Sequence, residues 1–132
     1  MIGLDSNILV RLLTEDDAPQ AAAVEAMFDR DPDEVFVINP VVLAELAWVL
    51  KTGYRFERHE IGAALDRVTR VDRFHIVDRS AVVSAVVRYL DDESRADFPD
   101  YLIQALNASA GAETTMTFDR KAAVEFGFRH IG

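Results

Sequence analysis

Carboxylate side chains within apolar segments or at their ends are the residues of this chain best suited to chemistry. Glu45 lies within the apolar segment 40–50, where Val41, Val42, Trp48 and Val49 are its neighbours three and four positions away. In a helix these neighbours share a face with Glu45, and we expect that face to be buried. Because an isolated ionised carboxylate in an apolar environment is costly, we expect Glu45 to be neutralised, paired or bound to a metal. Few cations accompany it, so the pattern favours a site that collects negative charge to hold a divalent ion.

Other acids occur where strands are expected to end or helices to begin. Asp5 ends the first apolar run, Asp119 follows the run 115–118, and Asp97 and Asp100 open a helical segment. In an open parallel sheet, ligands bind beyond the carboxyl ends of the strands. We therefore expect the segments that carry Asp5, Glu45, Asp100 and Asp119 to direct carboxylates towards one edge of the sheet.

Each acid also has a simpler structural explanation. Asp5 and Asp119 could cap the helices that follow them, and the pair Asp97 and Asp100 resembles a capping box. With 23 acidic residues in the chain, some fall at strand ends by chance. Glu45 lies too deep in its helix to act as a cap, so its alternative is an exposed side chain, which its apolar neighbours argue against.

The elements that must position these acids alternate along the sequence. Strands are predicted at 2–4, 35–38, 74–77, 114–117 and 128–131. Helices are predicted at 6–13, 19–29, 40–51, 58–71, 80–90, 99–110 and 121–126. This alternation is typical of an α/β fold. The length of 132 residues, with no stretch rich in Pro, Gly or Ser, predicts a single domain over 1–132.

Composition excludes several kinds of site. The chain has no cysteine, which rules out disulfides, thiol nucleophiles and cysteine-ligated zinc. Its histidines, His59, His75 and His130, lack the close spacing of a zinc site. No secretory signal pattern and no apolar run long enough to cross a bilayer is present, so we expect a soluble, cytoplasmic protein that is not bound to a membrane.

The net charge of −9 argues against a protein that coats nucleic acid with a broad basic face. It does not exclude an enzyme that acts on nucleic acid, because a divalent ion can supply the positive charge at the reacting phosphate. The basic residues that could guide the nucleic-acid backbone are Arg11, Lys51, Arg55, Arg120 and Lys121.

Four short motifs, read in order, resemble one known family. They are L-D-S-N at 4–7, V-V-L-A-E-L at 41–46, A-D-F-P-D-Y-L-I at 96–103 and T-F-D-R at 117–120. Together they resemble the PIN-domain ribonucleases, most closely the toxin subunits of VapBC-type toxin–antitoxin modules, over nearly the whole chain. The resemblance implies a PIN-like α/β/α sandwich with a central, mostly parallel sheet of four to five strands.

The same resemblance assigns roles to individual residues. The family's metal-site and catalytic acids match Asp5, Glu45, Asp100 and Asp119. Ser6 and Thr117 match polar residues that orient the site, and Asp97 matches a frequent extra acid beside it. Oxygen ligands without His or Cys favour Mg²⁺ or Mn²⁺ over zinc. Pro99 and Tyr101 replace the smaller residues common around Asp100, a departure that could alter substrate access.

The resemblance also implies an activity and partners. The expected activity is that of a Mg²⁺- or Mn²⁺-dependent endoribonuclease, the toxin of a toxin–antitoxin system, which hydrolyses single-stranded or looped RNA. The expected partners are the RNA substrate, a second copy in a homodimer, and a cognate antitoxin protein whose arm blocks the site. Two alternatives remain open. One is a Mg²⁺-dependent phosphatase-like domain, although Asp5-Ser6-Asn7 lacks the D-x-D pattern such an enzyme would use, and the other is a non-catalytic module whose acidic pocket binds a basic partner.

Overall fold

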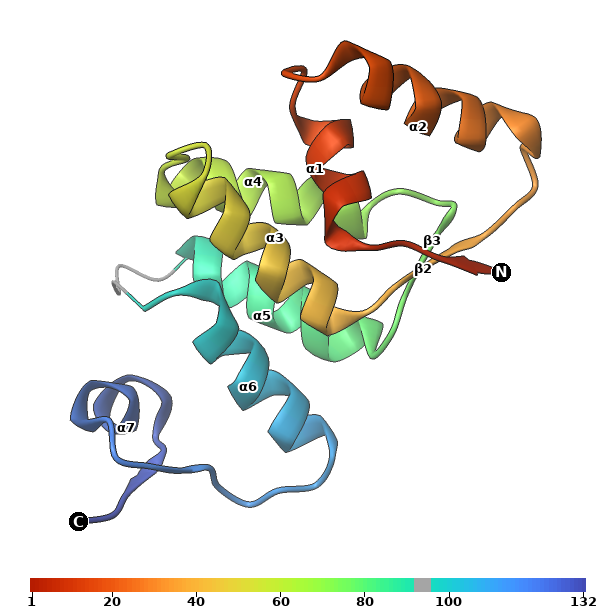
Figure 1. The fold of residues 1–132 in the computed structure, drawn as a ribbon. Helices are drawn as coiled ribbons and strands as arrows, with labels where there is room; N and C mark the ends of the chain where they lie inside the picture. The colour runs from red at the N-terminus through yellow and green to blue at the C-terminus, as the bar shows by residue number, and fades with distance from the viewer. Residues whose placement is uncertain (92–95) are drawn as a thin grey trace. The chain divides into compact units, whose positions relative to one another are not determined.

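The computed structural model describes residues 1–91 and 96–132, and short strands alternate with helices along them (Figure 1). The chain divides into two compact units, an N-terminal unit, Met1–Val77, and a C-terminal unit, Asp78–Gly132. Each unit has its own small parallel sheet. The acids singled out by the sequence are divided between the two units, so the units are described in turn.

The N-terminal unit is built on a three-stranded parallel sheet in the order β1-β2-β3. Its elements are β1 (Ile2–Gly3), α1 (Ser6–Leu13), α2 (Ala18–Arg30), β2 (Phe36–Ile38), α3 (Pro40–Thr52), α4 (Arg58–Thr69) and β3 (Phe74–Ile76). Phe36 of β2 is the register partner of Ile2 on one side and of Phe74 on the other. Within this unit α3 packs against both α1 and α4 (Figure 1).

Local signals explain where α3 begins and ends. The Asn39 side chain accepts a hydrogen bond from the Val41 backbone N–H, and Pro40 occupies the first turn, where its missing N–H costs nothing. The helix ends at Gly53. Its buried residues are Pro40, Leu43, Leu46, Ala47 and Leu50, spaced as one face of a helix requires.

The C-terminal unit contains α5 (Arg79–Asp91), α6 (Phe98–Ser109), β4 (Met116–Thr117), α7 (Arg120–Phe126) and β5 (Arg129–His130). The strands β4 and β5 pair in parallel. Helix α7 ends at Gly127, whose φ of 68° is in the left-handed region that glycine adopts without strain. The core of the unit is aromatic, with Tyr89, Phe98 and Tyr101 in edge-to-face contact.

The predicted α/β fold, with parallel strands alternating with helices, is confirmed. The prediction of one central sheet of four to five strands differs from the structure in how the strands are grouped. In the described ranges the strands form one sheet of three and one of two. In the two-stranded sheet, the backbone N–H groups of Arg129 and Ile131 donate to the carbonyls of Thr115 and Thr117. The single domain over 1–132 stays a prediction. Among the described residues, no helix has the length and apolar character that crossing a bilayer requires.

Candidate functional site

The C-terminal unit brings three of the predicted acids around one pocket. Asp97 is the N-cap residue of α6, Asp100 lies in the first turn of that helix, and Asp119 is the N-cap residue of α7. The pocket has a volume of about 220 Å³. Its lining consists of Ala96, Asp97, Asp100, Asp119, Lys121, Ala122, Glu125 and Phe126. The convergence predicted from strand ends and helix starts is therefore found for these three acids.

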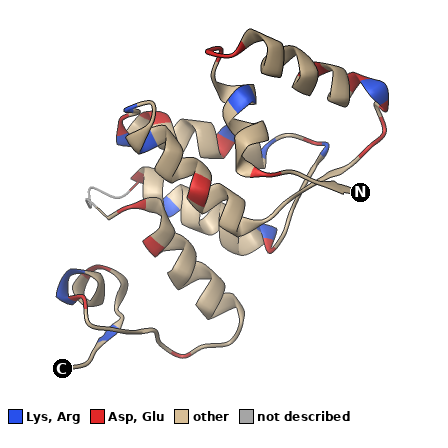
Figure 2. Ribbon diagram, viewed as in Figure 1, with Lys and Arg blue, Asp and Glu red and all other residues tan. Residues whose placement is uncertain are grey.

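Asp100 has the most unusual electrostatic environment of this group. Its pKa is raised above the ordinary value of 3.8, first by burial and then by the negative charges of Asp119, Asp97 and Glu125. Among the described residues that line the pocket, Lys121 is the one cation. Acidic residues are distributed over both units (Figure 2), so acidity alone would not distinguish this site. The raised pKa reflects the burial of Asp100 and the negative charges of the acids around it.

Asp119 combines a structural role with its place in the pocket. Its Oδ1 accepts hydrogen bonds from the backbone N–H groups of Lys121 at 2.9 Å and Ala122 at 3.2 Å. The hydroxyl of Thr117 in turn accepts from the backbone N–H of Asp119 at 2.9 Å. The capping explanation is thus correct for Asp119, and the cap also fixes the carboxylate at the pocket.

The capping explanation does not hold for Asp97. In the described structure its side chain makes no capping hydrogen bond to α6. Asp97 lines the pocket and raises the pKa of Asp100. These two contributions place it with the site acids.

Glu125 was missed by the sequence analysis. It lines the pocket from the last turn of α7 and contributes negative charge to Asp100. The helical spacing could have identified it. Glu125 lies four residues after Lys121, as Phe126 does after Ala122, so each pair shares a face of the helix that follows Asp119.

Asp5 and Ser6 lie in the N-terminal unit, after β1. The Asp5 Oδ1 atom accepts a hydrogen bond from the Ser6 backbone N–H at 2.7 Å and one from the Ser6 hydroxyl at 3.4 Å. Ser6 is buried and Asp5 is exposed. Asp5 therefore caps α1, and its exposed carboxylate follows the end of a parallel strand, as predicted.

The expectation that Glu45 lies on a buried face is wrong. Glu45 is exposed, and its neighbours Val41 and Trp48 are 65% and 62% exposed. Helix α3 carries apolar residues around most of its circumference, so the neighbours three and four positions away did not mark the core side. Because Glu45 is exposed, burial does not argue for a counter-charge beside it. Its role as a ligand depends on the family resemblance.

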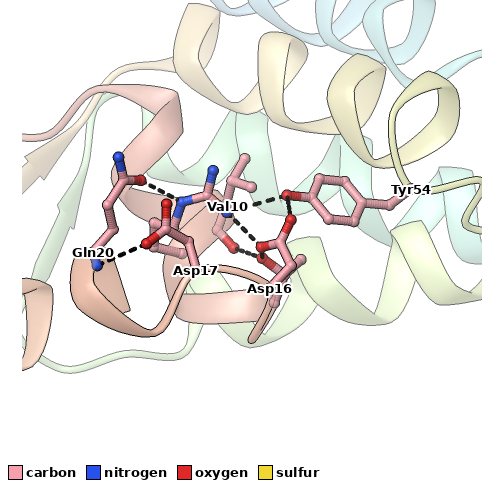
Figure 3. A network of polar contacts seen from close by, with 7 residues as sticks. Val10, Asp16, Asp17, Gln20 and Tyr54 are labelled. Atoms are coloured by element: carbon pink, nitrogen blue, oxygen red, sulfur yellow. Dashed lines mark hydrogen bonds and ion pairs between the residues drawn. The ribbon is translucent and has the colours of Figure 1, made fainter. Parts of the chain in front are cut away.

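Arg11, expected to guide a nucleic-acid backbone, is engaged within the N-terminal unit by Asp16, Gln20 and Tyr54, which are labelled in Figure 3. Its guanidinium donates to Asp16 and to Gln20, each at 2.6 Å, and to the Tyr54 hydroxyl at 3.2 Å. The Tyr54 hydroxyl donates to the other carboxylate oxygen of Asp16 at 2.7 Å. This network holds the end of α1 to the start of α2 and to the turn after α3, so Arg11 has a structural task.

The donor set of the C-terminal pocket fits a hard divalent cation. Its potential ligands are the carboxylate oxygens of Asp97, Asp100, Asp119 and Glu125, and Mg²⁺ and Mn²⁺ prefer oxygen ligands of this kind. Among residues 1–91 and 96–132, a group of three ligand atoms within 4.8 Å of one another occurs at Glu57, His59 and Glu60. There Glu57 and Glu60 already form the capping box of α4. The pocket acids are spaced more widely, which suits an ion that keeps several water ligands, as Mg²⁺ commonly does.

The predicted site residues are thus divided between the units. Asp97, Asp100, Thr117 and Asp119 belong to the C-terminal unit, and Asp5, Ser6 and Glu45 to the N-terminal unit. The structure brings Asp97, Asp100 and Asp119 together. A single site that also includes Asp5 and Glu45 stays a prediction.

Comparison with known proteins identifies the family. The model of the PIN domain matches residues 2–126, nearly the whole chain. A search of curated proteins gave no match. PIN domains are a family of metal-dependent nucleases that generally use divalent ions, in agreement with the acidic pocket on α6 and α7. The chain belongs to the PIN-domain family.

Proposed function

We propose that this protein is a Mg²⁺- or Mn²⁺-dependent endoribonuclease. The observation that carries this proposal is Asp100, whose carboxyl group is partly buried beside Asp97, Asp119 and Glu125 and has a raised pKa. Burial and neighbouring negative charge disfavour the ionised form of such a group, and a bound cation would favour it. Because the chain belongs to a family of metal-dependent nucleases, we infer that this cation is a divalent metal ion.

The chain's own residues have distinct tasks in this proposal. A divalent ion bound here would orient and activate water and stabilise negative charge on the phosphodiester. Asp119 presents a carboxylate that is fixed by its two bonds to the α7 backbone, and Thr117 holds the Asp119 backbone in turn. Asp100 supplies a second carboxylate, and Asp97 and Glu125 add negative charge. The family resemblance adds Asp5 and Glu45 as direct or water-mediated ligands, with Ser6 orienting Asp5.

One assay separates this function from its alternatives. The purified protein is given Mn²⁺ or Mg²⁺, with EDTA as the control, and is offered single-stranded RNA, hairpin RNA and a small phosphate ester. Cleavage within the RNA that requires metal supports the endoribonuclease. Phosphate release from the ester without RNA cleavage identifies the phosphatase-like alternative. If neither reaction occurs, the non-catalytic binding module is the remaining alternative.

We further propose that the nuclease acts as the toxin of a toxin–antitoxin module. This proposal depends on the order of the four motifs and their likeness to VapBC-type toxins. A short pulse of expression should arrest growth and produce new 5′ ends at defined positions in tRNA, rRNA or mRNA. The Asp5→Asn protein, expressed to the same level, should produce neither. Growth arrest without new RNA ends would contradict the proposed mechanism.

The proposed partners are a second copy of the chain and a basic antitoxin segment. The net charge of −9 and the carboxylates of the pocket favour a partner that carries Arg or Lys. On α3, exposed Val41 and Trp48 flank Glu45 and suit the apolar face of an amphipathic helix. The antitoxin segment should bind more weakly as Mn²⁺ is added, and replacing its Arg by Ala should remove that competition. If the affinity measured by calorimetry stays constant across the metal titration, the antitoxin segment does not block the site.

The homodimer is tested separately, by measuring the mass of the protein in solution by analytical ultracentrifugation.

A further inference from the structure

Arg88 of α5 has an unusual position for a charged side chain, among the aromatic residues of the C-terminal unit. Its guanidinium carbon lies 5.6 Å from the centre of the Tyr101 ring and 5.7 Å from that of Phe126. Its Nη1 atom donates a hydrogen bond to the side-chain oxygen of Gln104. Arg88 therefore contacts residues of both helices that carry the pocket acids, α6 and α7.

Gln104 extends this contact to the backbone of α7. While its oxygen accepts from Arg88, its Nε2 atom donates to the backbone carbonyl of Phe126 at 3.1 Å. Phe126 is the last residue of α7, and Gly127 ends the helix there. The Gln104 amide thus joins Arg88 on α5 to the carboxyl end of α7.

The two aromatic residues beside Arg88 directly follow pocket acids in the sequence. Tyr101 and Phe126 meet edge to face, with their ring centres 4.8 Å apart and their planes at 89°. Tyr101 immediately follows Asp100, and Phe126 immediately follows Glu125. Phe126 itself lines the acidic pocket. The ring contact therefore joins the segments that carry Asp100 and Glu125.

We propose that Arg88 is a positioning residue for the acidic pocket. Through Gln104, Tyr101 and Phe126 it fixes α7 against α6, and it thereby sets the separation of Asp100 from Asp119 and Glu125 that a divalent ion requires. Arginine suits this task because its planar guanidinium can stack on rings while it donates hydrogen bonds. Like-charged carboxylates tend to push the two helices apart, and Arg88 opposes that tendency. The inference rests on the proposed metal-dependent function of the same pocket.

Metal affinity measured without any RNA tests this role. Calorimetric titration with Mn²⁺ is carried out on the wild type and on Arg88→Met, which keeps a long apolar side chain but removes the guanidinium. We expect the Kd for Mn²⁺ to rise about tenfold, as is usual when a partner that orients a metal ligand is lost. Arg88→Lys should lie between the two, because it keeps the charge but loses the planar fork.

A matched control separates positioning from general loss of stability. Val82→Ala removes a fully buried apolar group from the same helix and is expected to lower the melting temperature. Its Kd for Mn²⁺ should stay within about twofold of the wild type, because it leaves the Arg88 contacts in place. A Kd that is unchanged in Arg88→Met, or that rises equally in Val82→Ala, would overturn the proposal.

Two further results make the test decisive. If Arg88→Met does not fold, Gln104→Met replaces it, since that change breaks both hydrogen bonds of the amide and leaves Arg88 present. The same rise in Kd is expected, and an unchanged Kd overturns the proposal. Wild-type protein that binds no Mn²⁺ also overturns it. Wild-type protein that binds Mn²⁺ but cleaves no RNA contradicts the proposed endoribonuclease and leaves the role of Arg88 to be decided by the titration.

Discussion

Asp16 in the N-terminal unit and Asp100 in the C-terminal unit are aspartates of the same acidic chain in opposite electrostatic surroundings. Asp16 accepts hydrogen bonds from Tyr54, Arg11 and Thr14 (Figure 3). Its pKa is lowered, mainly by the hydrogen bond from the Tyr54 hydroxyl, with the Thr14 bond and the charge of Arg11 acting in the same direction. The pKa of Asp100 is raised, first by burial and then by neighbouring carboxylates.

This difference in pKa separates acids whose charge stabilises the fold from acids that are candidates for binding a ligand. The partners of Asp16 all belong to the chain, so its charge is already compensated when the protein folds. Asp100 is partly buried near Asp97, Asp119 and Glu125, which disfavour its ionised form, and a bound cation would stabilise that form. A carboxylate compensated by the fold is structural, whereas one surrounded by other carboxylates is a candidate for function.

Loss of the Asp100 charge should have the largest effect on catalysis, whereas loss of the Asp16 charge should have little effect. Asp100→Asn is expected to lower RNA cleavage at least ~100-fold, because it removes a ligand charge and keeps the side-chain shape. The same loss is expected for Asp5→Asn and Glu45→Gln. Asp16→Asn should change the rate by less than about threefold, since that carboxylate serves the fold. The measurement is the initial rate on single-stranded RNA at saturating Mn²⁺. Full activity in two of the three site variants would contradict the assignment.

Metal should stabilise the folded protein through the proposed ligand carboxylates and not through Asp16. A ligand that binds the folded state alone adds about 2.7 kcal/mol at a hundredfold excess over its Kd. Mn²⁺ and Mg²⁺ should therefore raise the melting temperature of the wild type and of Asp16→Asn alike, and the increase should shrink as protons compete for the carboxylates at lower pH. The increase should be lost in the double variant Asp5→Asn, Asp119→Asn. An equal increase in that variant would show that the ions bind elsewhere.

A smaller effect is expected when the compensated aspartate loses its main partner. Tyr54→Phe removes the hydroxyl that donates to Asp16 and accepts from Arg11. The melting temperature should fall by a few degrees, and the pKa of Asp16 should rise towards its ordinary value. RNA cleavage should be unaffected. Thermal denaturation and an NMR titration of the Asp16 carboxyl group check the two expectations, and a pKa that does not change would show that Arg11 and Thr14 are sufficient.

Local signals made much of the fold predictable from sequence. The starts of α3 and α7 depend on Asn39 with Pro40 and on Asp119, and the end of α7 depends on Gly127. These are interactions within a few residues, which sequence reports directly. The convergence of Asp97, Asp100 and Asp119 was predictable for a related reason, since helix starts and strand ends place side chains at the edges of parallel sheets.

Tertiary packing explains what the sequence did not reveal. The apolar character of α3 on most sides hid the fact that Leu43, Leu46 and Leu50 face the core and Glu45 faces solvent. Glu125 joins the pocket only because α7 packs against α6, a contact between separate elements. The division of the strands into two sheets depends likewise on which backbone groups meet after folding.

The most subtle consequence of the comparison is an opposite dependence of stability on pH in metal-free protein. Asp100 has a folded pKa above its unfolded value of 3.8, so the folded state binds the proton more tightly, and its contribution to stability is lost as pH rises through that raised pKa. Asp16 has a folded pKa below 3.8, so its contribution is present above that value and is lost as pH falls through the lowered pKa.

Asp100→Asn should therefore gain stability relative to the wild type as pH rises from about 3 to about 7, because it removes the repulsion that ionisation creates. Asp16→Asn should lose stability relative to the wild type over the same range, because it removes a charge that the fold stabilises. Urea denaturation in EDTA at a series of pH values measures both differences, with the wild type as the common reference. Curves for the two variants that diverge from the wild type in opposite directions would confirm that the fold stabilises the charge of Asp16 and disfavours that of Asp100, and curves that stay parallel would refute it.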